Sequence, residues 1–208
     1  MIRLTLKDEP AGFDKKVRRR GVAFLRGNPA PTGKEFLPHG YWKDAAKDLH
    51  AAYSGICAYS CMLIPPPGTV DHFFPKSSYP QLAYEWSNYR LSSHRLNNYK
   101  AESTRVIDPF VVQPGWFVLD VPSCLIKPGS ALNDVVSEQV RATIDVLKLN
   151  ADDYLVQERC DILMSYATGD LSIGFLARRY PFLAFELERQ GIQEAVRGML
   201  KTPAGPSP

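Results

Sequence analysis

Residues 70–100 read VDHFFPKSSYPQLAYEWSNYRLSSHRLNNYK, and this stretch decides the expected fold. Residues 69–74 predict a strand and residues 88–92 predict the strand that returns beside it. The segment that follows, residues 94–103, predicts the start of a helix. The stretch therefore predicts a β-hairpin followed by a helix, a ββα unit.

Four polar side chains in this unit have the order and spacing of a nuclease that uses one metal ion. Asp71 directly precedes His72, and Asn88 follows His72 by sixteen residues. Asn97 comes nine residues after Asn88. In this arrangement one group activates water, one holds the loop, and two oxygen ligands bind a divalent cation. No other part of the chain competes as a source of chemistry.

Each of these side chains has an expected role. His72 is the expected general base, because an imidazole ordinarily titrates near neutral pH. Asp71 and Asn97 are the expected ligands of Mg²⁺ or Mn²⁺, which prefers oxygen and keeps several waters. Asn88 is expected to hold the loop and to orient His72. In the alternative interpretation Asn97 caps the helix and Asn98 is the second ligand.

The motif resembles that of the HNH endonuclease family, which reads Asp-His, then Asn-Leu-x-x-Leu-Cys-x-x-Cys-His/Asn. The second part here is NYRLSSHRLN, residues 88–97, so that Asn88 matches the middle Asn and Asn97 the final position. Lys100 falls where the family often has a Lys or Arg close to the phosphates. The resemblance implies metal-dependent cleavage of DNA.

A wider resemblance covers roughly residues 40–165 and points to HNH proteins of Septu-type and retron-associated antiphage systems. It depends on CAY at 57–59, on DHFFPK at 71–76 with EWSN at 85–88, and on TIDVLKLN at 143–150. It implies the effector of a prokaryotic defence system and, as in Septu-like systems, a regulatory ATPase partner. The sequence leaves self-association open.

The structural zinc of many family members is not expected here. Their two Cys-x-x-Cys pairs correspond to Cys57 and Cys61, which are one residue too far apart, and to Ser93 and Leu96. His94 is a third candidate ligand, but a structural zinc needs four. We expect packing to replace the metal, with Leu96, Met62 and Leu63 as the side chains that fill the space.

The bulk composition is ordinary for a globular protein in the cytoplasm. The 208 residues are 45% hydrophobic and 23% charged, with a net charge of +3. No apolar run approaches the ~20 residues of a membrane span, and no signal peptide is recognisable. Four cysteines in a chain of this size fit a reducing compartment.

The first 26 residues hold eight Lys or Arg against three acids, which predicts a basic segment that either contacts phosphate or is simply solvated. The expected nucleic-acid contacts are Lys76, Arg90, Arg95, Lys100, Arg18, Arg19 and Arg20. The aromatic residues Tyr79, Tyr84, Trp86 and Tyr89 are candidates for stacking on bases, but core packing is favoured.

The expected fold is α+β, with an HNH-type ββα core embedded in a mainly helical domain. A short strand is expected at residues 2–6. The predicted parts are a basic N-terminal arm at 1–40, the nuclease core at 41–128, a helical region at 129–201 and a disordered tail at 202–208.

The expected function is hydrolysis of DNA phosphodiester bonds. Two alternatives stay open: a catalytically weak or inactive subunit that binds nucleic acid or acts as a scaffold, and a nuclease that cleaves RNA such as tRNA.

Overall fold

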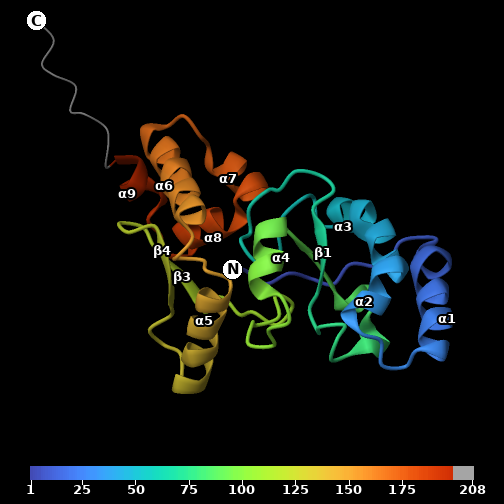
Figure 1. The fold of residues 1–208 in the computed structure, drawn as a ribbon. Helices are drawn as coiled ribbons and strands as arrows, with labels where there is room; N and C mark the ends of the chain where they lie inside the picture. The colour runs from blue at the N-terminus through green and yellow to red at the C-terminus, as the bar shows by residue number, and fades with distance from the viewer. Residues whose placement is uncertain (199–208) are drawn as a thin grey trace, which may run out of the picture.

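The computed structural model describes residues 1–198, and within them the protein is mostly helical with two small antiparallel sheets (Figure 1). This confirms the expected α+β class. The tail predicted at 202–208, and the end of the helical region predicted up to 201, lie outside the described residues. The α-helices are α1 (Arg19–Gly27), α2 (Gly33–Phe36), α3 (Ala46–Ala52), α4 (His94–Lys100), α5 (Asp134–Val146), α6 (Asp153–Thr168), α7 (Ile173–Arg179), α8 (Pro181–Arg189) and α9 (Gln193–Gly198).

The N-terminal segment is folded onto the body of the protein. A π-helical turn, η1 (Asp14–Arg18), continues into α1, and the two bury Phe13, Val17 and Phe24. The strand predicted at residues 2–6 is wrong, because within residues 1–198 no strand pairs with this segment. Its Leu4 N–H donates to the Pro109 carbonyl at 2.9 Å.

The predicted ββα unit is present. Strands β1 (Thr69–His72) and β2 (Tyr89–Ser92) pair antiparallel, with Asp71 opposite Arg90 and His72 opposite Tyr89. Helix α4 follows directly, and its N-cap is Ser93, whose hydroxyl accepts the Leu96 N–H. Asn97 is therefore not the cap.

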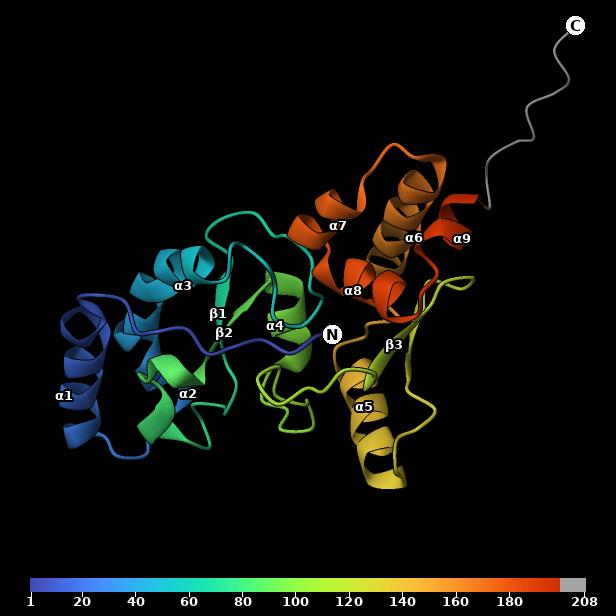
Figure 2. The same cartoon turned by 180° about the vertical axis from the view of Figure 1, so that it is seen from behind.

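The ββα unit lies between two hydrophobic cores. The N-terminal core packs α1, α3 and the connection between β1 and β2, and includes Phe36, Tyr84, Trp86 and Tyr89. In both views α4 lies at the centre of the molecule, between the N-terminal helices and the C-terminal helices (Figures 1 and 2). Leu96 of α4 belongs to the second core, which extends into the C-terminal helices.

The second hairpin packs with the C-terminal helices. Strands β3 (Phe117–Asp120) and β4 (Leu125–Pro128) pair antiparallel and contact α8 and α5. Three of these helices begin at capping side chains, Asn133 for α5, Asp152 for α6 and Ser172 for α7. Among the described helices, none has the length and apolar character required to cross a membrane.

Candidate functional site

Three of the four motif residues line one small cavity of about 60 Å³. Asp71 and His72 reach it from the end of β1, and Asn97 reaches it from α4. The rest of the lining is Pro75, Lys76, Ala101 and Glu102. The hairpin and helix thus bring together residues that are twenty-six positions apart, as the spacing predicts.

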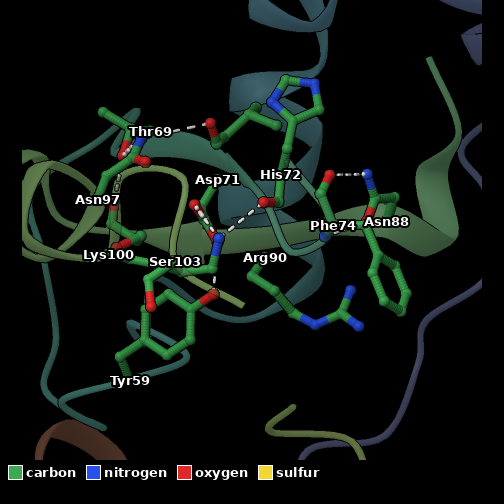
Figure 3. Close-up of polar contacts among 12 residues, drawn as sticks. Tyr59, Thr69, Asp71, His72, Phe74, Asn88, Arg90, Asn97, Lys100 and Ser103 are labelled. Atoms are coloured by element: carbon green, nitrogen blue, oxygen red, sulfur yellow. Dashed lines mark hydrogen bonds and ion pairs between the residues drawn. The ribbon is translucent and has the colours of Figure 1, made fainter. Parts of the chain in front are cut away.

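Asp71 is buried and clamped by two donors (Figure 3). The Lys100 ammonium lies 3.2 Å from Oδ1, and the Tyr59 hydroxyl donates to Oδ2. Lys100 also donates to the His72 carbonyl at 2.8 Å. Burial raises the pKa of Asp71 and lowers that of Lys100, whereas their mutual attraction opposes both shifts. Inside the protein, the charge of Asp71 and the charge of Lys100 compensate each other.

His72 points to the opposite face of the strand from Asp71 and is held by a carbonyl (Figure 3). Its Nε2 lies 2.9 Å from the Ala83 oxygen, and the ring meets Trp42 and Tyr89 edge-to-face. A carbonyl only accepts, so Nε2 carries the proton and Nδ1 has the lone pair. Burial lowers the pKa of His72 to about 3, which keeps the ring neutral at physiological pH.

Asn88 holds the loop that follows β1. Its Oδ1 accepts the Phe74 N–H at 2.8 Å, and its Nδ2 donates to the carbonyls of Phe74 and Leu82 at 3.0 and 3.1 Å. The residue after Leu82 is Ala83, whose carbonyl bonds to His72. Asn88 therefore acts on His72 through the loop, without touching the ring.

Asn97, and not Asn98, lines the cavity. The Asn97 amide nitrogen donates to Thr69 Oγ1 at 3.2 Å and to the Val70 carbonyl at 3.4 Å. These bonds use the nitrogen, so the amide oxygen is left for a ligand. Asn98 is exposed on another side of α4.

Two predicted nucleic-acid contacts are wrong. Arg90 is 3% exposed and makes a two-pronged ion pair with Asp108 at 2.7 and 2.9 Å, with its guanidinium 3.6 Å from the Phe110 ring centre. The Lys100 side chain has no exposed surface. Both buried cations pair with carboxylates, Arg90 with half-buried Asp108 and Lys100 with buried Asp71, and do not present their charge to a phosphate.

The other predicted basic contacts are at or near the surface but have partners. Arg18 pairs with Glu9 and Glu85, Arg19 with Asp14, and Arg20 with Asp44. Arg95 pairs with buried Asp152 at 2.8 Å and keeps about half of its side chain exposed. Lys76 is half-buried and lies over the Trp42 and Phe36 rings. Contact of these five residues with nucleic acid stays a prediction.

The region of the expected zinc replacement is filled by side chains. Cys57 and Cys61 are buried in the second core together with Met62 and Leu96. Leu63, in contrast, is 36% exposed, so that it contributes less than predicted. In residues 1–198, no three or more His, Cys, Asp and Glu side chains gather as metal ligands.

The cavity suits a hard divalent cation in the kind of donors it offers. A carboxylate oxygen of Asp71 and the amide oxygen of Asn97 are ligands that Mg²⁺ accepts, and Glu102 adds a second carboxylate to the lining. The Lys100 ammonium is a rival cation at Asp71. A metal ion here would share that carboxylate with Lys100 or displace it.

Three parts of this site have no predictive signal in the motif. Tyr59 lies twelve residues before Asp71 and reaches it from a separate loop. The Ala83 carbonyl belongs to the backbone, and Glu102 follows the end of α4. CAY at 57–59 carries part of the family resemblance, and it was the signal that could have marked Tyr59.

In comparisons with known proteins, no protein-family model and no curated protein matches this chain.

Proposed function

We propose that the protein is a metal-dependent endonuclease of the HNH type that hydrolyses phosphodiester bonds in DNA. One observation carries the proposal: a ββα unit gathers Asp71, His72 and Asn97 around one cavity. Asn88 fixes the intervening loop through three hydrogen bonds. A carboxylate, an amide oxygen and a neutral imidazole are the groups that hydrolysis with one metal ion requires.

His72 is the group that would activate water. Its Nδ1 has the lone pair because Nε2 donates to Ala83, so Nδ1 takes the proton as the water oxygen bonds to phosphorus. The bond from phosphorus to the 3′ oxygen breaks in the same displacement. A divalent cation on Asp71 and Asn97 would supply Lewis-acid stabilisation of the phosphate and of the leaving oxygen.

The contacts around Asp71 hold the motif residues in place. Tyr59 and Lys100 fix the two oxygens of the carboxylate, and Lys100 also holds the carbonyl of His72. A site held by such buried contacts loses little rotamer freedom when substrate binds. These groups position the motif and are not expected to transfer protons.

Cleavage of supercoiled plasmid in Mg²⁺ or Mn²⁺ tests the proposal directly. We expect wild type to cleave, EDTA to abolish cleavage, and His72→Ala to lower the rate by roughly 10²- to 10⁴-fold. Asn98→Ala is the matched control and should cleave like wild type. Circular dichroism shows whether each variant is folded. Equal cleavage by wild type and folded His72→Ala would overturn the assignment of the base.

Calorimetric titration with Mn²⁺ tests the metal site without relying on activity. Asn97→Ala should weaken binding, because it removes the amide oxygen of a residue that lines the cavity, while Asn98→Ala should bind as wild type does. Equal affinities in the two variants would show that Asn97 is not a ligand.

A second candidate function, a module that binds nucleic acid with weak or no catalysis, also has specific support. Lys100 already neutralises Asp71, and a His72 with a pKa of about 3 is a weaker base than one matched to neutral pH. Such a module would bind DNA with a salt-dependent affinity that is insensitive to His72→Ala. Binding by both proteins without cleavage would favour it.

The role in antiphage defence and the regulatory ATPase partner are proposed on the resemblance of the motif alone. An ATPase recovered with the protein from its native host, and cleavage only in its presence, would support that partner. The same assay with RNA in place of DNA distinguishes the RNA-cleaving alternative.

A further inference from the structure

Two aromatic side chains are exposed on the loop beside the cavity. Phe74 is 41% exposed and Tyr79 is 36% exposed, and their ring centres lie 5.2 Å apart. Pro75 and Lys76, the two residues directly after Phe74, line the cavity itself. An unpaired base next to a phosphate in the cavity is therefore within reach of this aromatic pair.

The loop that presents the pair is held rigidly. Both polar backbone groups of Phe74 are bonded to the buried side chain of Asn88. The N–H of Tyr79 donates to the Pro75 carbonyl at 2.8 Å, which closes a tight turn. In a flexible loop an exposed Phe side chain could turn inward and become buried. The hydrogen bonds of this loop instead hold Phe74 at the surface.

The pair continues a row of aromatic contacts from the interior. Phe73 packs edge-to-face on Phe74 with ring centres 5.0 Å apart, and Phe73 itself lies over the cations of Arg90 and Lys100. The other aromatic candidates, Tyr84, Trp86 and Tyr89, are all in the N-terminal core. Among the four aromatic residues predicted either to stack or to pack, Tyr79 is thus the one at the surface.

From this geometry we infer that Phe74 and Tyr79 form a stacking platform for an unpaired base of a DNA strand whose phosphate enters the cavity. The inference rests on the proposed nuclease function and adds the substrate class, single-stranded or locally unpaired DNA. Every base has an aromatic face, so such a platform binds without regard to sequence. A base in a duplex is already stacked on its neighbours and cannot use it. Half-buried Lys76 lines the cavity and lies between Phe74 and Tyr79 in the sequence, and it adds a positive charge that suits the DNA backbone.

The test is fluorescence anisotropy with a labelled single-stranded DNA oligonucleotide and with its duplex, in EDTA so that no strand is cut. Phe74→Ala and Tyr79→Ala should each weaken single-strand binding by roughly 5- to 150-fold, the effect of losing one base–aromatic stack. Phe74→Trp keeps an aromatic face and should retain the affinity. Tyr154→Ala is the matched control, since Tyr154 is 58% exposed on α6 and does not line the cavity.

Two results would overturn the inference: folded Phe74→Ala that binds single strands like Tyr154→Ala, or equal weakening of single-strand and duplex binding. Dependence on Phe74 with RNA of the same sequence but not with DNA would overturn the assignment to DNA. Cleavage is scored separately. Aromatic-dependent binding without any cleavage would favour the non-catalytic module and support the platform, whereas cleavage without aromatic-dependent binding would support the nuclease and overturn the platform.

Discussion

The two β-hairpins of this protein are equal in length but differ in what they bury. In β3 burial alternates along the strand and in β4 only Ile126 is buried, and the charged pair Lys127 and Asp120 lies at the surface with a contact of 3.0 Å. In β1–β2 every residue except the first is buried, including Asp71, His72 and Arg90. The first pattern is the ordinary one for a sheet with one face on a core.

The difference shows that the β1–β2 hairpin carries the free-energy cost of burying charged and polar side chains. Burying charged and polar groups is unfavourable unless every one finds a partner. In residues 1–198 no buried side-chain nitrogen or oxygen lacks a hydrogen bond. Natural sequences break local patterns mainly at functional or strained sites. This departure from the ordinary pattern supports placing the proposed site in the β1–β2 hairpin.

The largest effect should come from breaking the buried pair of β1–β2. Lys100→Met leaves the Asp71 carboxylate buried without its cation, which should lower the free energy of unfolding by about 3–5 kcal/mol. Equilibrium unfolding in urea measures it. The double variant Asp71→Asn/Lys100→Met removes both charges and should recover much of the loss. A loss below about 1 kcal/mol in Lys100→Met would show that the pair is not a buried ion pair in solution.

Removing the second donor to Asp71 should have a smaller effect. Tyr59→Phe deletes a buried hydrogen bond to a charged group, and we expect a loss of about 1.5–3 kcal/mol in the same unfolding measurement. Tyr99→Phe is the matched control, because the Tyr99 hydroxyl also donates to a carboxylate, that of Asp152, from a half-buried position. Equal losses of the free energy of unfolding in Tyr59→Phe and Tyr99→Phe would mean that the burial of Asp71 does not strengthen its hydrogen bond with Tyr59.

The pH dependence of stability should report the burial of His72. Its pKa is about 3 in the folded protein and about 6.5 when unfolded, so the unfolded chain binds the proton first as the pH falls. The contribution is complete above pH ~6.5 and is lost progressively as the pH falls toward 3. Between pH 7 and 5 wild type should lose about 2 kcal/mol more than His72→Asn. Parallel losses in both proteins would show that His72 titrates normally.

Local patterns predicted the elements of the site. The strands, expected at 69–74 and 88–92, are Thr69–His72 and Tyr89–Ser92, and the helix begins at His94 as expected. Strand and helix signals act over a few neighbouring positions, so they are readable in the sequence. The grouping of Asp71, His72 and Asn97 follows from those elements.

Distant partners could not be predicted. From the sequence, Arg90 and Lys100 are both predicted to contact phosphate. In the structure Arg90 contacts Asp108 and Phe110, and Lys100, on α4, contacts Asp71. The expected strand at residues 2–6 fails for the same reason, because alternation predicts a strand but does not supply a neighbour to pair with. What a charged side chain does depends on burial, and burial is set by the whole fold.

The smallest effect should come from the surface pair of the other hairpin. Lys127→Met removes an ion pair whose two side chains are 56% and 31% exposed, so water and salt already screen it. We expect a change of about 0–1 kcal/mol in the free energy of unfolding, and high salt should erase what there is. The substitution matches Lys100→Met in chemistry and differs in burial. A loss as large as that of Lys100→Met would mean that β3–β4 also depends on a buried charge, and the contrast between the hairpins would no longer support placing the proposed site in β1–β2.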